Sequence, residues 1–124
     1  MREYKFRVWH KAAEQMLHGQ VPGDCFRWAR EGQPLVIMQY TELHDDTEDD
    51  NELFEGDIVA ITWADEKHIC KIEFSAGTFM FVADSLPDGY LPLHELAEYD
   101  RRYGWIEGAK KLGNIYTSPE LLGG

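Results

Sequence analysis

The sequence predicts an all-β fold with one short helix, and three observations support this prediction. Apolar and polar side chains alternate with a period of two in several segments, as they do in half-buried strands. Short polar turns separate three of these segments in the second half of the chain, which is typical of an antiparallel meander. Only residues 93–103 carry apolar side chains at helical spacing over more than one turn.

The predicted strands follow one another along the chain and are separated by polar turns or loops. They are residues 4–9, 35–41, 58–63, 69–74, 78–83 and 112–116. Tyr4, Phe6 and Val8 share one face of the first strand. Between the first two strands, residues 12–17 fit either a helical turn or a short strand, and residues 19–23 form a loop punctuated by glycine and proline.

The single helix is predicted for residues 93–103, where Leu93 and Leu96 have helical spacing. Gly104 follows directly and is expected to act as the C-terminal stop of this helix. After the last strand, Ser118 precedes a proline and is expected to cap a final short turn.

The inward faces of these elements define a predicted core. Its members are Phe6, Val8, Ile58, Val59, Ile61, Ile72, Phe74, Phe79, Phe81, Leu96 and Ile115. Cys70 alternates with charged residues in the same way as Ile72, so we expect a small core residue and not a nucleophile. The other cysteine, Cys25, is far away in the sequence, and both thiols are expected to be reduced.

The composition indicates a small acidic protein. A chain of 124 residues suffices for one domain or for two very small ones, here residues 1–52 and 53–124. Asp and Glu number 23 against 12 Lys and Arg, and the net charge of −11 disfavours direct nucleic-acid binding because it repels phosphate. The sequence contains neither a membrane-spanning apolar run nor a signal-peptide pattern, so we expect a soluble, cytoplasmic protein.

The negative charge is concentrated in the middle of the chain. Residues 31–66 contain no lysine or arginine, and residues 44–52 contain no large apolar side chain. We therefore expect residues 44–52 to form a solvated loop that attracts a basic protein surface. The predicted partner-binding residues are Asp45, Asp46, Glu48, Asp49, Asp50 and Glu52.

The same carboxylates allow a second hypothesis, a divalent-metal site. Asp46, Glu48 and Asp50 have the alternate spacing of the first EF-hand ligands, and Asp57 stands where the last ligand would be. Asn51 replaces the glycine that such a loop requires, and no predicted helix flanks the loop. The metal hypothesis is therefore limited to weak Ca²⁺ or Mg²⁺ binding by these four carboxylates, and no other cofactor is expected.

No catalytic residue is predicted. The five histidines are scattered and lack metalloenzyme spacing, and the sequence contains no phosphate-binding glycine loop or nucleophile elbow. The only catalytic hypothesis left is a metal-dependent hydrolase that would use the carboxylates of residues 42–57.

Five short fragments, taken in order, resemble the YopX protein family of phages and prophages. They are REYKFRVW at residues 2–9, MQYT at 38–41, EGDIV at 55–59, GNIY at 113–116 and SPELL at 118–122. The resemblance implies an all-β chain whose second half is similar to a small SH3-like barrel, expressed in the cytoplasm of a bacterial host. It implies no established enzymatic activity. The chain departs from the family pattern at His10, where an acidic residue is usual, and at residues 42–52, where a hairpin with glycine and lysine is usual.

Turn chemistry explains the most distinctive residues of these fragments. Gly56 lies between the acidic segment and an apolar strand, where glycine permits the positive φ of a sharp turn. Asp57 can accept backbone hydrogen bonds in the same turn. Gly113 is expected at a bulge or at a close approach of two backbones.

Two classes of function follow. The favoured one is a non-enzymatic accessory module that binds a host or phage protein with a basic surface, and its sharper form is a mimic of nucleic acid. The alternative is a divalent-metal-binding protein or metal-dependent hydrolase. No membrane partner is expected, and self-association stays open.

Overall fold

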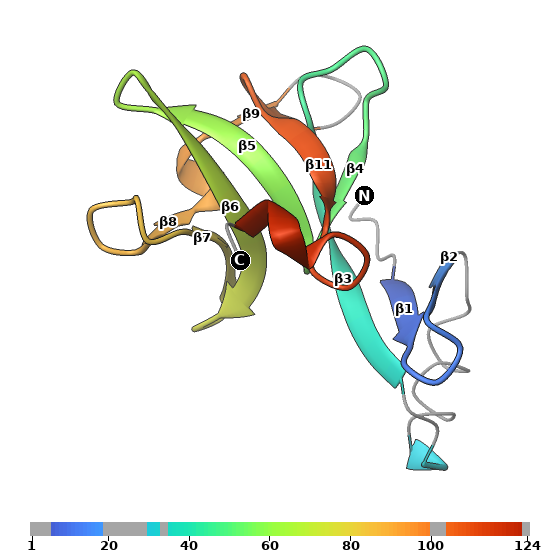
Figure 1. Ribbon diagram of the computed structural model, residues 1–124. Coiled ribbons are helices and arrows are strands. Elements are labelled where there is room, and N and C mark those ends of the chain that lie inside the picture. Colours follow the sequence, from blue (N-terminus) through green and yellow to red (C-terminus); the bar gives the residue numbers. More distant parts are fainter. Residues whose placement is uncertain (1–5, 19–29, 33–34, 100–103, 123–124) are drawn as a thin grey trace. The chain divides into compact units, whose positions relative to one another are not determined.

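The computed structural model describes residues 6–18, 30–32, 35–99 and 104–122 (Figure 1). The chain divides into two units, residues 1–40 and 41–124. The boundary lies between Tyr40 and Thr41, so the acidic segment belongs to the second unit together with the strands that follow it. Within the described ranges, no helix is long and apolar enough to cross a membrane.

Unit 1 contains an antiparallel sheet that explains its period-two sequence pattern. Its strands are β1 (Phe6–His10), β2 (Gln15–His18) and the first part of β3 (Leu35–His44). Val8 pairs with Leu17 on one side and with Ile37 on the other, and it is completely buried, as predicted. A short strand, and not a helical turn, thus follows β1. Tyr4, Cys25 and residues 19–23 lie outside the described residues.

Unit 2 contains a five-stranded antiparallel sheet, which confirms the predicted meander. In order across the sheet, its strands are β11 (Lys110–Asn114), β5 (Asp57–Trp63), β6 (Glu66–Ser75), β7 (Thr78–Val82) and β8 (Tyr90–Pro92). The turn from β5 to β6 has φ values of 52° at Ala64 and 63° at Asp65. Two successive positive φ values give a hairpin turn the twist that adjacent antiparallel strands require.

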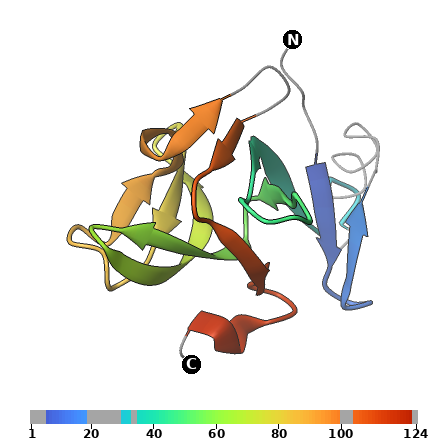
Figure 2. The ribbon, with the colours of Figure 1, turned by 90° about the horizontal axis from the view of Figure 1, so that it is seen from above.

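A second group of strands in unit 2 depends on pairing between distant segments. The last part of β3 pairs with β4 (Glu52–Phe54) and, in parallel, with β10 (Gly104–Ile106), which pairs in turn with β9 (Ala97–Tyr99). Figure 2 shows β9 and β10 beside each other, in orange. The acidic segment connects β3 to β4 and therefore lies at this group of strands.

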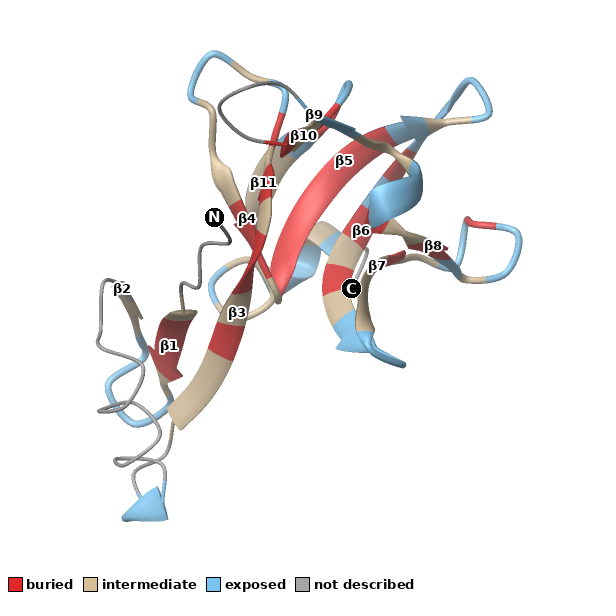
Figure 3. Cartoon of the chain, turned by 180° about the vertical axis from the view of Figure 1, so that it is seen from behind, coloured by how far each residue is buried: buried red, intermediate tan, exposed pale blue. Residues whose placement is uncertain are grey.

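The core of unit 2 draws on both groups of strands. Its buried members are Leu43, Leu53, Val59, Ile61, Cys70, Ile72, Phe81, Leu86, Leu91, Leu93, Ile106 and Ala109. Figure 3 shows that β5 is buried along most of its length. The predicted burial of Val59, Ile61, Ile72 and Phe81 is confirmed, and Ile58 is also completely buried. Burial raises the pKa of the Cys70 thiol to about 11, so Cys70 is a neutral core residue, as predicted.

The predicted core is wrong at Phe74, whose side chain is 46% exposed. Phe74 lies near the end of β6, where the ring contacts Phe79 edge-to-face with 4.9 Å between ring centroids. Phe79 and Leu96 are partly buried and pack against the core. Phe6 and Ile115 are also only partly buried. Alternation in sequence identifies a strand's faces, but it does not tell how far the core extends along them.

The predicted helix over residues 93–103 is wrong. Its first residues form only the 3₁₀ turn η1 (Leu93–Glu95), and β9 follows in an extended conformation. Gly104 is not a helix stop but a member of β10, where an added Cβ would lie 2.7 Å from Leu43 Cδ2. Glycine is needed there because the neighbouring strands approach closely. Residues 100–103 lie outside the described residues.

The end of the chain folds around Gly113, as predicted. The register of β11 on β5 shifts between Lys111 and Gly113, which marks a bulge, and a Cβ on Gly113 would lie 2.8 Å from Ser118 Oγ. The strand ends at Asn114, whose Oδ1 accepts hydrogen bonds from the backbone N–H groups of the next turn. The final turn predicted after Ser118 is the 3₁₀ turn η2 (Pro119–Leu122).

Candidate functional site

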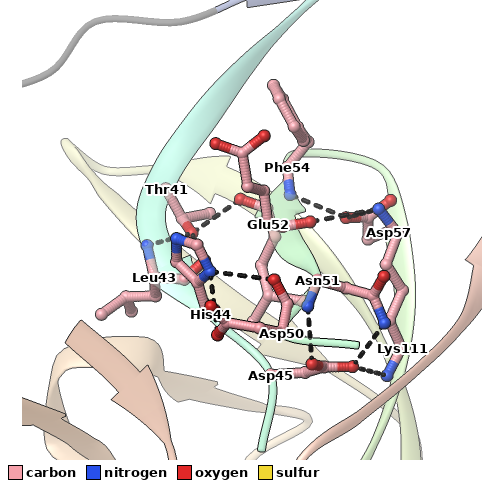
Figure 4. A network of polar contacts seen from close by, with 11 residues as sticks. Thr41, Leu43, His44, Asp45, Asp50, Asn51, Glu52, Phe54, Asp57 and Lys111 are labelled. Atoms are coloured by element: carbon pink, nitrogen blue, oxygen red, sulfur yellow. Dashed lines mark hydrogen bonds and ion pairs between the residues drawn. The ribbon is translucent and has the colours of Figure 1, made fainter. Parts of the chain in front are cut away.

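The acidic segment is organised around one buried carboxylate, that of Asp45. Asp45 is only 2% exposed, and it accepts four hydrogen bonds of 2.9 to 3.0 Å (Figure 4). Oδ1 accepts from Thr47 Oγ1 and the Asn51 backbone N–H, and Oδ2 accepts from Asn51 Nδ2 and the Lys111 backbone N–H. The negative charge of Asp45 is therefore used inside the protein.

The pKa of Asp45 lies below its ordinary value of 3.8. Burial on its own raises this pKa, but the hydrogen bonds from Asn51, Lys111 and Thr47 together outweigh it, because they stabilise the charged form. The sequence placed Asp45 among the partner-binding residues of a solvated loop, but the structure buries its side chain. A carboxylate that is desolvated and bonded on both oxygens does not present itself to another protein.

Backbone hydrogen bonds close the acidic segment into a compact structure. The Asp45 backbone N–H donates to Asn51 O at 2.9 Å, and that of Asp50 donates to Thr47 O at 3.0 Å. Asp46 bonds the turn between β10 and β11: its N–H donates to Ala109 O at 2.8 Å, and its Oδ2 accepts from the Gly108 N–H at 2.9 Å. The expected solvated loop is thus tied down at both ends.

A second buried carboxylate, that of Asp57, anchors the segment that follows. Asp57 Oδ2 accepts a 2.7 Å hydrogen bond from the Phe54 N–H and lies 3.2 Å from Lys111 Nζ. Gly56, which lies between Phe54 and Asp57 in the sequence, has a φ of 89°. The predicted roles of Gly56 and Asp57 in a tight turn are therefore confirmed. Lys111 Nζ also donates to Glu52 O at 3.1 Å, so this lysine joins both carboxylates to β4.

Some acids of the segment are not buried by the hydrogen bonds around Asp45 and remain at the surface. Asp46, Glu48 and Asp49 are exposed. Asp50 is partly buried, with its Oδ1 3.1 Å from His44 Nδ1, and Glu52 is also partly buried. Of the six predicted partner-binding residues, Asp46, Glu48 and Asp49 are therefore the exposed ones.

Three further glutamates, which the sequence reasoning missed, come to the same part of unit 2. The turn that Asp46 bonds also carries Glu107, which is exposed. Glu107 lines a surface hollow of about 420 Å³ together with Glu95, Glu98 and the backbone at Gly108. We call Asp46, Glu48, Asp49, Glu95, Glu98 and Glu107 the acidic face. Asp46 bonds Gly108, and Gly108 lines the hollow with the three glutamates, so segments that are far apart in sequence contribute these acids.

The four predicted metal candidates have different neighbours. Asp46 bonds the Gly108 N–H, Asp50 lies beside His44, and Asp57 lies beside Lys111. Glu48 is exposed. In the described part of the chain, no three His, Cys, Asp or Glu side chains are grouped so that they could hold a metal ion. The arrangement provides charge and hydrogen-bonded rigidity, but it gives no coordination geometry.

Comparisons with known proteins identify a family and support the fold. A family model described as YopX protein matches residues 20–123. The structure is similar to the crystal structure of protein EF1440 from Enterococcus faecalis, with a TM-score of 0.59 and 24% sequence identity over 98% of this chain and 99% of that chain. It is also similar to the X-ray structure of protein yopX from Bacillus subtilis, with a TM-score of 0.58 and 19% identity over 95% of this chain and 97% of that chain.

These structural similarities show the fold alone, since both sequence identities are below 25%. The similarities extend over nearly the whole length of each chain. Neither description names a ligand, a substrate or a partner. No curated protein matches the chain.

Proposed function

The chain belongs to the YopX family, and from this premise we propose that it is a non-enzymatic phage or prophage accessory protein that binds a host or phage protein with a basic surface. The acidic face is the binding surface. The observation that carries this proposal is the rigid support of exposed carboxylates by the buried Asp45 network.

Rigid support matters because mutually repelling carboxylates lose affinity if they must be ordered at the moment of binding. Asp45 organises the turn that presents Glu48 and Asp49, and the contacts of Asp46 fix this turn to Gly108. The entropic cost of ordering the loop has therefore been met on folding, which is the general advantage of preorganisation.

The sign of the charge selects the partner. The segments that carry the acidic face, residues 42–55, 93–99 and 104–109, contain no lysine or arginine. A surface of one sign accelerates association with a surface of the opposite sign and suppresses other encounters. In a bacterial cytoplasm, where we place the protein, nucleic-acid-binding proteins are a main class with such surfaces. The sharper proposal is that the carboxylates take the place of phosphates on such a protein.

A salt-dependent capture experiment tests this function. The wild-type chain is immobilised and exposed to bacterial host lysate, beside a variant with Glu48→Gln, Asp49→Asn, Glu98→Gln and Glu107→Gln. A matched control has Asp65→Asn, Glu66→Gln, Asp84→Asn and Asp88→Asn, which are exposed acids that do not belong to the acidic face. Both variants change the net charge equally.

We expect one or a few basic proteins to be captured by the wild type and by the control, and to be lost with the acidic-face variant. Capture should also fall steeply above physiological ionic strength, where the screening length is about 8 Å or less. The proposal is wrong if both variants capture the same proteins as the wild type, or if both lose them equally.

A further inference from the structure

A second surface of unit 2 has the opposite character to the acidic face. On β6, His68, Cys70 and Ile72 point into the core, so the alternate residues Lys67 and Ile69 lie on the outer face of the sheet. Ile69 is 41% exposed although it is a large aliphatic residue in the middle of a sheet strand. A single exposed apolar residue is ordinary, but a larger apolar patch with a polar rim is a feature of docking sites.

The outer face of β6 is hollowed. A groove of about 570 Å³ is lined by Lys67, Ile69 and Lys71 of β6, by Val82 of β7 and by Leu121 and Leu122 of η2. η2 lies against β6 and β11 (Figure 1). Its residues Leu121 and Leu122 form one wall of this groove. Leu122, on that wall, is itself 41% exposed. Two of the exposed large apolar side chains of the described chain therefore meet in one groove.

The position of η2 depends on Gly113. A Cβ at residue 113 would lie 2.9 Å from Ser118 Cβ and 3.2 Å from Leu121 Cδ1, so any other residue would push the final turn away from the sheet. The groove is thus a built feature of unit 2, because its wall is held by the bulge in β11 and by the hydrogen bond from the Ser118 N–H to Asn114 O at 2.9 Å.

The charge of the groove is unusual for so acidic a chain. Four lysines and no arginines belong to the described residues of unit 2, and two of these lysines line the groove. Lys71 forms an ion pair of 2.9 Å with Glu73 Oε1. Lys67 is exposed and has no ion pair within the described ranges. Asp84 is the one acid that lines the groove, and it stands at the β7 end.

We propose that this groove docks an extended segment of a partner protein in which an apolar side chain is flanked by two carboxylates. The spacing supports this occupant. Lys67, Ile69 and Lys71 occupy alternate positions on one strand face, about 13 Å from end to end at roughly 3.3 Å per residue. An extended peptide with acidic residues at positions i and i+4 and an apolar residue at i+2 has the same spacing and the complementary charges.

This inference is independent of the acidic face, because the groove is proposed to bind an acidic peptide and the acidic face a basic surface. A suitable probe is a fluorescein-labelled heptapeptide with glutamate at the second and sixth positions, leucine at the fourth and threonine elsewhere. Two comparison peptides replace both glutamates by lysine, or the leucine by serine. Binding to the full chain is followed by fluorescence anisotropy, and the contacted residues are mapped from amide chemical shifts.

We expect the glutamate-leucine peptide to bind the wild type and to shift the amide signals of Lys67, Ile69 and Leu122. Lys67→Glu and Ile69→Thr should each weaken binding about fivefold or more. Lys67→Glu replaces attraction to a peptide glutamate by repulsion, and Ile69→Thr removes apolar contact with the peptide leucine. Lys11→Glu is the matched control, since this exposed lysine lies in unit 1 and makes the same change in net charge. Its affinity should equal that of the wild type.

Three outcomes would overturn the proposal. The first is the absence of any binding by the wild type at millimolar peptide. The second is an equal loss of affinity in the Lys67→Glu and Lys11→Glu variants, which would show a general charge effect. The third is an equal response of the groove signals to the lysine peptide. If the lysine peptide changes only the amide chemical shifts of the acidic face, this result supports the function proposed above and leaves the groove specific for the glutamate peptide.

Discussion

Asp45 Oδ2 accepts a hydrogen bond of 3.0 Å from the backbone N–H of Lys111, which lies 66 residues later in the chain. The side chain of the same lysine reaches Asp57, so one residue of β11 serves two buried carboxylates. Unpaired, each of these carboxylates would be costly to bury. The acidic segment is therefore part of the folded structure of unit 2, and its exposed acids are presented by a fixed turn.

Asp45→Ala should destabilise unit 2 although the residue belongs to a polar, acidic segment. The substitution leaves the partly buried N–H groups of Asn51 and Lys111 without their acceptor. We expect a loss of about 3 kcal/mol in the free energy of unfolding, measured by urea denaturation. Asp49→Ala is the control, because this exposed residue should change stability by no more than about 0.5 kcal/mol. Equal effects of the two substitutions would contradict the buried network.

The stability that Asp45 provides should depend on pH. Its pKa is lowered in the folded state, so its contribution is present above the unfolded value near 3.8 and is lost as the pH falls through the folded value. The difference in melting temperature between the wild type and Asp45→Asn should therefore be constant near neutral pH and should shrink below about pH 4. Asp49→Asn should show no such narrowing. A difference that persists unchanged at about pH 2 would contradict the charged state of Asp45.

The predictable part of the fold is the part whose signal is local. The strands β5, β6 and β7 were predictable because alternation and short turns occur within one continuous stretch. β9 and β10 were not, since each has only three residues and β10 pairs with a strand about sixty residues earlier. The spacing of Leu93 and Leu96 fits a helix and equally fits a single turn before a strand.

The candidate site divides in the same way. The turn at Gly56 and Asp57 was predictable because both residues act within a few positions of each other. The burial of Asp45 was not, because its neighbours in sequence are equally acidic and only contacts with Asn51 and Lys111 single it out. Charge counting locates an acidic segment, but it does not show which carboxylate faces inward.

The two phenylalanines of neighbouring strands should respond very differently to truncation. Phe81 is completely buried, so Phe81→Ala should lower the free energy of unfolding by about 3 to 5 kcal/mol. Phe74 is 46% exposed and loses mainly its edge-to-face contact with Phe79, so Phe74→Ala should cost less than about 1.5 kcal/mol. Thermal melts of both variants test this order, and a larger loss for Phe74→Ala would show that the core extends to the end of β6.

The ion pair between Lys111 and Asp57 should be revealed by a double substitution. Lys111→Met keeps an unbranched apolar side chain but removes the ammonium, which lies 5.9 Å from the Phe54 ring centroid, and it leaves the carboxylate of Asp57 buried without this partner. The expected cost is about 3 to 5 kcal/mol. Adding Asp57→Asn removes the uncompensated charge and retains an oxygen that can accept from the Phe54 N–H, so the double variant should be more stable than Lys111→Met alone. Chemical denaturation of the four proteins completes the cycle, and strictly additive losses would show that the two charges do not interact.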